Sequence, residues 1–334
     1  MGEPYFTERV REVVLTRLPE LGVREVVSVD RLSGGLSFET YTVSTRMVDG
    51  PGRLILRREP TGGPLAPYDI GFEAEIYRSL AGSSVPVPEV YLHEPDTAVL
   101  DRPFVIAEFV PGEAFVHSSA RFDDAGMREE VLGRFVEMLA RVHTVPVEGL
   151  PCGPGGVGTG AGDEVRHWRQ RFAEVELSPR PIIRRVLDVL EEHAPRDHPQ
   201  ALVHGDFRLS NLLWRDGEIA CVLDWERSFI GDPLADVAFT RNKALAGWCR
   251  IGGPAAERYT ELTGYEIDPR RILFWQLVEL VKVVYVGMAS AASLARGGTT
   301  DLRLLSVANA STAVEPAMVR LVDALVSGAK EGAR

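Results

Sequence analysis

The chain has 334 residues, of which 45% are hydrophobic, and it carries a formal net charge of −11 at pH 7. A chain of this length can form two domains, or one large one, around a sizeable core. Its acidic charge argues against a nucleic-acid partner, because nucleic-acid phosphates require a basic surface.

Cysteine content and hydropathy narrow the class of protein further. The three cysteines are far apart in the sequence and form no CxxC or Cys/His cluster, so neither a disulfide framework nor a zinc site is expected. The first residues lack the basic-then-apolar pattern of a secretion signal. The longest apolar run, 272–294, is interrupted by Gln276, Glu279 and Lys282, which favours a buried helix over a membrane span. We therefore expect a soluble cytoplasmic protein with no membrane partner.

The N-terminal segment begins with a helix pattern and continues as a hairpin. Residues 6–18 have the apolar spacing of an amphipathic helix, and residues 26–31 read as a strand. The segment 32–38 contains a glycine pair and leads into a second strand-like stretch, 39–44, which predicts a β-hairpin. The N–H groups of such a turn can lie against phosphates, because glycine has no Cβ; an ordinary hairpin turn is the simpler interpretation of this segment alone.

The next strand carries two adjacent arginines. Alternation along residues 53–58 places Arg57 and Arg58 on opposite faces of this strand. A segment rich in Gly and Pro, 61–67, predicts a loop, and residues 69–80 then have the pattern of a helix.

Two further strand-like segments, 85–90 and 104–110, complete the N-terminal part. Pro111-Gly112 ends the second of them. We place the boundary between two lobes here, with residues 1–110 in the first and 111–334 in the second.

The middle of the chain is predominantly helical. Residues 127–143, 164–173 and 182–192 have core spacing of helices. Between the first two lies a glycine-rich stretch, 149–162. Residues 153–158 within it match GxGxxG formally, but this match follows no convincing strand and contains proline, so we interpret it as a loop and not as a nucleotide site.

A polar cluster between two apolar strand-like runs is the most informative part of the sequence. It contains His204, Asp206 and Asn211, and Asp224 directly follows the second run, 219–223. Strand ends position catalytic carboxylates rigidly while leaving them accessible. Turn-forming Asp and Asn residues are the alternative interpretation. The order and spacing favour phosphoryl transfer, in which one Asp takes the proton of a hydroxyl while an Asn and a second Asp bind Mg²⁺.

The remainder of the chain is predicted to be helical. Asp232 followed by proline indicates a helix start, with Asp232 as N-cap, and Asp236 lies one turn further on. Residues 254–262, 271–294 and 302–326 complete a helical C-terminal half.

The segments HGDFRLSNLLW and VLDWERSFIGDPLADVAF resemble the aminoglycoside phosphotransferase-like family of small-molecule kinases. The resemblance is strongest to the branch related to kinase-like domains fused to some acyl-CoA dehydrogenases, and it runs from about Leu32 to the C-terminal helices. It implies an α+β, protein-kinase-like fold with a small β-rich N-lobe and a large, mostly helical C-lobe. It also implies transfer of the γ-phosphate of ATP to a hydroxyl group.

The same resemblance assigns roles to individual residues. Asp206 would be the catalytic base, and Asn211 and Asp224 would bind Mg²⁺. His204 would support the loop, and Arg208 would contact the substrate or the phosphates. The implied nucleotide contacts are Ser33, Gly34 and Gly35 at the phosphates, Arg57 paired with Glu73, and the hinge residues Glu108, Phe109 and Val110.

Two of these assignments leave alternatives open. Arg57 stands where related kinases have a lysine, and Arg58 is the alternative phosphate contact if the strand register differs by one. Glu73 and Glu75 point to different sides of their helix, so only one of them can pair with the strand cation. Asp236 matches the family Asp that holds the backbone of the catalytic loop.

The sequence therefore predicts an ATP- and Mg²⁺-dependent O-phosphotransferase that acts on a small hydroxylated molecule. A catalytically weak nucleotide-binding pseudokinase is the alternative. A protein kinase is disfavoured, since Gly231 follows Asp224 too soon for an activation segment. The acceptor stays open between an aminoglycoside or other antibiotic and a hydroxyacyl-type metabolite, and Glu279 as the one carboxylate of the helix from Arg271 favours a less cationic acceptor. The sequence also leaves open the choice of ATP or GTP, and of monomer or homodimer.

Overall fold

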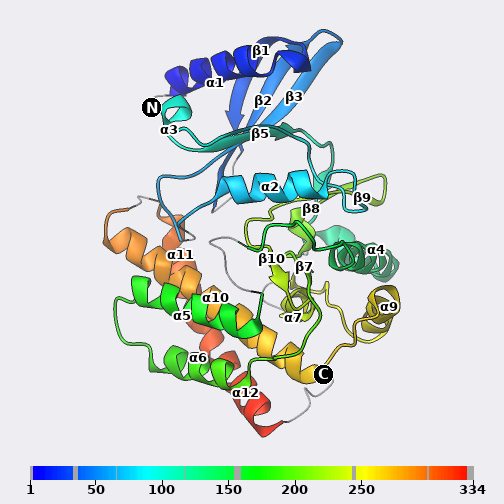
Figure 1. The fold of residues 1–334 in the computed structure, drawn as a ribbon, viewed down its shortest axis with the longest axis vertical. Helices are drawn as coiled ribbons and strands as arrows, with labels where there is room; N and C mark the ends of the chain where they lie inside the picture. Colours follow the sequence, from blue (N-terminus) through cyan, green and yellow to red (C-terminus); the bar gives the residue numbers. More distant parts are fainter. Residues whose placement is uncertain are drawn as a thin grey trace.

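Two lobes make up the chain, an antiparallel sheet with three helices above a larger, mainly helical part (Figure 1). The computed structural model describes residues 3–32, 37–64, 66–116, 118–153, 159–242, 246–298 and 301–328. The predicted α+β, kinase-like architecture is confirmed by this arrangement and by structures compared below.

The N-lobe is built on one five-stranded antiparallel sheet with the order β1-β2-β3-β5-β4. Its strands are β1 (Val23–Arg31), β2 (Glu39–Met47), β3 (Gly50–Arg58), β4 (Val90–Glu94) and β5 (Phe104–Glu108). The predicted strand at 85–90 therefore lies a few residues too early in the chain.

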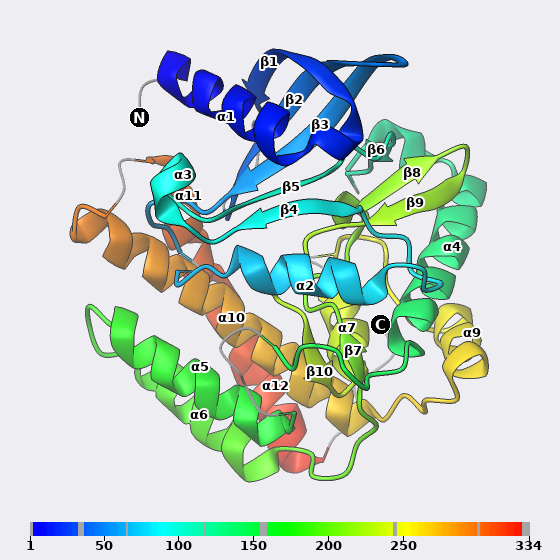
Figure 2. The same ribbon diagram turned by 45° about the horizontal axis from the view of Figure 1, so that its top comes forward.

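Helices cover both faces of this sheet (Figure 2). On one face, α1 (Glu3–Arg17) and α3 (Thr97–Leu100) pack on the even-numbered side chains of β3 and β5. On the other face, α2 (Ile70–Leu80) packs on the odd-numbered side chains of β5. Because strand residues alternate between faces, Arg57 lies on the α2 face and Arg58 on the α1 face.

The C-lobe contains most of the helices and two small sheets. Its helices are α4 (Ala125–His143), α5 (Ala161–Val175), α6 (Pro181–His193), α7 (Leu234–Arg241), α9 (Pro254–Thr263), α10 (Pro269–Ala295), α11 (Arg303–Ala310) and α12 (Glu315–Ser327). Its strands are β6 (Glu113–Ala114), β7 (Ala201–Val203), β8 (Leu212–Arg215), β9 (Glu218–Val222) and β10 (Phe229–Gly231). The sheets have the orders β6-β8-β9 and β10-β7.

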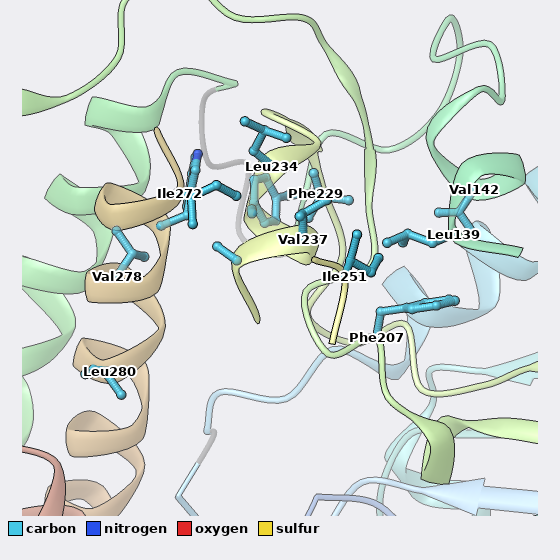
Figure 3. Packing of buried hydrophobic residues seen from close by; sticks show 14 of the residues in the cluster. Leu139, Val142, Phe207, Phe229, Leu234, Val237, Ile251, Ile272, Val278 and Leu280 are labelled. Carbon is cyan, nitrogen blue, oxygen red and sulfur yellow. The ribbon is translucent and has the colours of Figure 1, made fainter. Parts of the chain in front are cut away.

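One continuous core joins these elements. Figure 3 shows Phe207, from the loop after β7, pointing toward Leu139 of α4, with Val237 of α7 and Ile272 of α10 in the same cluster. Phe207 is fully buried, and its ring centroid lies 4.6 Å from that of Phe135. The loop that carries the polar motif is therefore anchored by its own apolar residue.

Helix α10 is the longest helix of the described residues. By length and composition alone it could cross a membrane, with a mean hydropathy of 1.7 over an 18-residue window. Of that window, 89% is buried inside the structure, as expected of the central helix of a folded domain.

Two predicted helix boundaries are wrong. Helix α7 begins at Leu234 with Pro233 as its N-cap, and not with Asp232 as the cap. Asp232 still accepts a hydrogen bond from the Leu234 N–H at 2.9 Å, but it also accepts bonds from Arg271 Nε at 2.9 Å and Trp275 Nε1 at 2.8 Å. The predicted helix at 302–326 is divided into α11, a 3₁₀ turn and α12.

Candidate active site

The imidazole of His204 connects two segments that are distant in the sequence. Its Nε2 lies 2.9 Å from the carbonyl oxygen of Leu223, and its Nδ1 accepts a hydrogen bond from the Asp206 N–H at 3.2 Å. These partners require a neutral ring that is protonated on Nε2. Burial lowers the pKa of His204, which favours the same neutral form. His204 thus ties the start of the loop to the segment that ends in Asp224.

Asp236 of α7 holds the backbone of the same loop. Its two carboxylate oxygens accept hydrogen bonds from the N–H groups of His204 at 2.7 Å and Gly205 at 2.8 Å. The ring of His143 lies 3.0 Å from the same carboxylate. Burial opposes the charge of Asp236, but its hydrogen bonds with His143 and the His204 N–H favour the charged form, and the pKa is lowered. Asp236 therefore lies where the resemblance places it.

Gly205 is required by the geometry of this loop. Its φ is +77°, in the left-handed region, and a Cβ at this position would lie 2.3 Å from the carbonyl oxygen of Arg227. Such an approach is possible only for a residue without a side chain. The loop backbone consequently packs directly against the segment after Asp224.

Asp206 is positioned by two neighbours within its own loop. Asn211 Nδ2 donates to Asp206 Oδ2 at 3.0 Å, and Arg208 Nη2 lies 3.1 Å from the same oxygen. The side chain of Asp206 is 12% exposed, so it is oriented but accessible. Because the amide nitrogen of Asn211 faces Asp206, its amide oxygen is the atom that could ligate a cation.

Asp224 is held by a cation of the N-lobe. Arg57 Nη2 lies 2.9 Å from Asp224 Oδ1, and Arg57 Nη1 lies 2.7 Å from Glu73 Oε1. The structure thus contains the predicted ion pair with Glu73, whereas Glu75 is exposed. Burial disfavours the charged form of Asp224, but the charge and hydrogen bond of Arg57 outweigh it and lower the pKa.

Glu73 also binds the backbone next to Asp224. Its Oε1 accepts hydrogen bonds from the Trp225 N–H at 3.2 Å and from the Tyr77 hydroxyl at 3.3 Å. Glu73 is 1% exposed. One carboxylate of α2 therefore fixes both the arginine of β3 and the backbone of the C-lobe segment.

Sequence reasoning missed Glu226. This residue accepts a hydrogen bond from the Ser37 hydroxyl at 2.5 Å, across the junction of the lobes. Burial, followed by the negative charge of Asp224, raises the pKa of Glu226 to about 8. The signal for Glu226 in the sequence was its position two residues after Asp224. Alternate residues of an extended segment point to the same side, and Trp225 between them points into the core.

A buried chain of alternating charges, also missed, lies beside this site. Arg227 Nη2 lies 3.3 Å from Glu279, and Lys282 Nζ lies 2.9 Å from Glu279 and 3.0 Å from Glu164. Trp168 Nε1 donates to Glu164 at 2.9 Å. Glu279 was predicted as a lone wall carboxylate, but the structure shows it paired with two cations.

The structure describes only some of the remaining residues that were predicted to contact the nucleotide. Ser33, Gly34 and Gly35 lie outside the described residues. At the predicted hinge, the Glu108 N–H donates to the Glu89 carbonyl oxygen at 2.8 Å. It is therefore engaged within the protein, and Phe109 and Val110 are the better candidates for a backbone donor to adenine.

Arg58 does not face the site. It donates to Glu39 at 2.6 Å and to the Leu100 carbonyl oxygen at 3.2 Å, and its guanidinium lies 4.3 Å from the Phe6 ring centroid. Arg58 is therefore a buried structural cation of the N-lobe and does not lie where the alternative phosphate contact would be.

The donors present suit a hard cation. Among the described residues, no group of three or more His, Cys, Asp and Glu side chains could hold a metal by itself. Mg²⁺ in phosphoryl-transfer sites uses one or two carboxylates together with substrate phosphates and water. The carboxylate of Asp224 and the amide oxygen of Asn211 fit that chemistry.

Comparison with protein families and sequences gives a consistent assignment. A family model described as "Phosphotransferase enzyme family" matches residues 28–275. Acyl-CoA dehydrogenase family member 10 of Mus musculus is 33% identical over 223 residues, which cover 66% of this chain and 20% of that protein. Member 11 of Homo sapiens is 30% identical over 189 residues, covering 55% and 24%. The chain thus matches only a fifth to a quarter of these curated relatives.

Solved structures establish the fold. A Ralstonia eutropha protein classed by inference as an aminoglycoside phosphotransferase has a TM-score of 0.72 and 21% identity, covering 95% of this chain and 98% of its own. The aminoglycoside phosphotransferase APH(4)-Ia, in a ternary complex with AMP-PNP and hygromycin B, has a TM-score of 0.64 and 21% identity, covering 93% and 98%. A macrolide 2'-phosphotransferase of Brachybacterium faecium has a TM-score of 0.57 and 21% identity, covering 90% and 97%.

Proposed function

The chain belongs to the phosphotransferase enzyme family, and we propose that it transfers the γ-phosphate of ATP to a hydroxyl group of a small molecule. The observation that carries this proposal is the junction between the lobes. There Asp206 and Asn211, hydrogen-bonded to each other, are tied through His204 to the segment of Asp224, which Arg57 and Glu73 hold from the other side.

Asp206 is proposed as the base. Its Oδ2 is fixed by Asn211 and Arg208, so that the carboxylate needs no reorientation to accept a hydroxyl proton. As the acceptor oxygen bonds to the γ-phosphorus, the bond from that phosphorus to the bridging oxygen breaks and ADP leaves. Transition states of this kind are loose, and the base takes the proton late.

The phosphates would meet cations from both lobes. Asn211 and Asp224 are proposed to hold Mg²⁺, which would neutralise charge on the β- and γ-phosphates. Arg57 would contact the α- and β-phosphates, and Ser33, Gly34 and Gly35 would cover them. Phe109 and Val110 would bind adenine through their backbone, with Glu108 offering only its carbonyl oxygen. The AMP-PNP bound to APH(4)-Ia supports an adenine nucleotide as donor.

The charges beside Asp206 support an acceptor that is not a polycation. Glu279 and Glu164 are the buried carboxylates of this wall, and Lys282 and Arg227 already neutralise them. A polyamine antibiotic needs carboxylates free to pair with its ammonium groups. We therefore favour a neutral or anionic hydroxylated metabolite, of which a hydroxyacyl compound is one, over an aminoglycoside. We expect it to be bound in the cytoplasm, without nucleic acid or membrane.

An ADP-release assay over three sets of acceptors would test this function. The sets are aminoglycosides, neutral hydroxyl compounds such as macrolides and sugars, and hydroxyacyl thioesters, with mass spectrometry of the product. We expect one phosphate to be added to a compound of the second or third set, and no addition by Asp206→Asn. Binding of ATP without transfer to any acceptor would instead support the regulatory pseudokinase.

A further inference from the structure

The carboxylate proposed for the metal is engaged by a cation of the protein. Arg57 uses its two terminal nitrogens on two different carboxylates, with Nη1 2.7 Å from Glu73 and Nη2 2.9 Å from Asp224. We infer that Arg57 is a resident counter-ion of Asp224 that keeps bare divalent cations out, so that the metal enters only together with the nucleotide phosphates. This inference rests on the metal role proposed for Asp224.

Arg57 cannot easily move away from this position. It projects from β3 in the sheet interior, its side chain is 17% exposed, and its guanidinium carbon lies 4.9 Å from the centroid of the Phe38 ring. Glu73, which holds one arm, is itself fixed by the Trp225 N–H and the Tyr77 hydroxyl. A guanidinium so constrained repels any divalent cation that approaches Asp224 without compensating negative charge.

The local charge balance gives the arginine its effect. Asp224 and Glu73 are two carboxylates at the lobe junction, and Arg57 contacts both of them. Without it, these carboxylates would attract a divalent ion. With Arg57 in place, a divalent ion needs additional negative charge, which its ligand must supply. The triphosphate of a nucleotide carries that charge.

An arginine suits this task better than a lysine. The planar guanidinium presents separate N–H groups to two carboxylates at once, whereas an ammonium is a single point charge on a flexible stem. The Nε of Arg57 is buried and has no hydrogen-bond partner among the described residues. Through its positive charge, the same side chain can also attract the phosphates of the nucleotide.

Binding of Mn²⁺ alone, followed by electron paramagnetic resonance, would test the inference without any catalytic readout. We expect Arg57→Gln to bind Mn²⁺ about tenfold or more tightly than wild type in the absence of nucleotide, while its ATP affinity falls. Opposite shifts of this kind would not follow from general damage to the site. Arg46→Gln removes an exposed arginine of β2 and serves as the control for net charge.

Two further variants complete the design. Arg57→Lys keeps a charge but not the bridge, so its Mn²⁺ affinity should lie between those of wild type and Arg57→Gln; it decides the matter if Arg57→Gln does not fold. The double variant Arg57→Gln/Asp224→Asn should lose the increase in Mn²⁺ affinity that Arg57→Gln shows. Mn²⁺ affinity of Arg57→Gln equal to or below that of Arg46→Gln would overturn the inference. Tighter Mn²⁺ binding with no phosphoryl transfer to any acceptor would uphold it and reject only the proposed function.

Discussion

The amide nitrogen of Asn211 lies 3.0 Å from the carboxylate of Asp206, so the two residues form one hydrogen-bonded unit. A change in either residue therefore affects the orientation of the other. A substitution that keeps this hydrogen bond tests the chemical role of the side chain without changing the geometry of the loop. Such substitutions are preferable to truncation of the side chain.

Replacement of Asp206 should remove phosphoryl transfer but spare ATP binding, because the proposed base would contact the acceptor and not the nucleotide. For Asp206→Asn and Asp206→Ala we expect kcat to fall by roughly 10²- to 10⁴-fold, the range of a positioned base. Calorimetric titration with ATP should give nearly the wild-type Kd. Near-normal turnover in either variant would exclude Asp206 as the base.

Asp224→Asn should weaken binding of Mg·ATP. The substitution replaces a hard anionic ligand by a neutral one and also removes one partner of Arg57. Calorimetry with Mg·ATP, compared with ATP in the presence of a chelator, measures the loss. Equal affinities of variant and wild type for Mg·ATP would argue against a metal role.

Substitution of Arg57 should affect catalysis, whereas substitution of Arg58 should affect stability. Arg57→Ala should raise the KM for ATP and lower kcat, and Arg57→Lys should retain part of the activity. Arg58→Ala should leave both constants nearly unchanged but lower the melting temperature, because Arg58 is buried with Glu39 as its partner. If Arg58→Ala impairs kinetics more than Arg57→Ala does, the proposed phosphate contact is wrong.

Glu226 should make stability depend on pH. Its pKa in the folded chain, about 8, lies above the ordinary value of 4.5, so the unfolded state releases its proton first as pH rises. Below pH 4.5, Glu226 makes its full contribution to the free energy of unfolding. This contribution decreases as pH rises and is lost at about pH 8. With metal chelated, the melting temperature of Glu226→Gln relative to wild type should rise between these values and then level off. A constant difference would show that Glu226 titrates normally.

Lys282→Met should be strongly destabilising. It would leave Glu279 and Glu164 buried without their shared cation, a loss that typically costs about 3–5 kcal/mol. Urea denaturation measures this cost. The double variant Lys282→Met/Glu164→Gln is the matched comparison and should recover part of the stability, since it removes the uncompensated charge of Glu164 while Glu279 keeps Arg227 as its partner. No recovery would mean that packing, and not charge, accounts for the loss.

The polar motif could be predicted from sequence because it is local. His204, Asp206 and Asn211 lie within one loop, and the alternation of β3 placed Arg57 and Arg58 on opposite faces. The same local reasoning assigned Asp232 only to a helix start and missed Arg271 and Trp275, which are its other partners.

Contacts between distant segments could not be read in this way. The Ser37–Glu226 hydrogen bond spans 189 residues, and the Arg227–Glu279 pair spans 52. Each depends on how the lobes and helices pack, which no local pattern encodes. Sequence reasoning therefore identified the residues proposed to react, but it missed the buried charges that surround them.

The hydrogen bond from the Trp225 N–H to Glu73 has a mechanical consequence. Helix α2 packs on the sheet of the N-lobe, while Trp225 belongs to the C-lobe and is buried in its core. Any hinge rotation that opens the lobes must break this bond or pull the backbone beside Asp224, whose φ of +69° already places it in a rarely populated region. A rotation of the lobes would therefore change the backbone next to Asp224, where we propose that the metal binds, and a ligand bound there would in turn restrict the rotation.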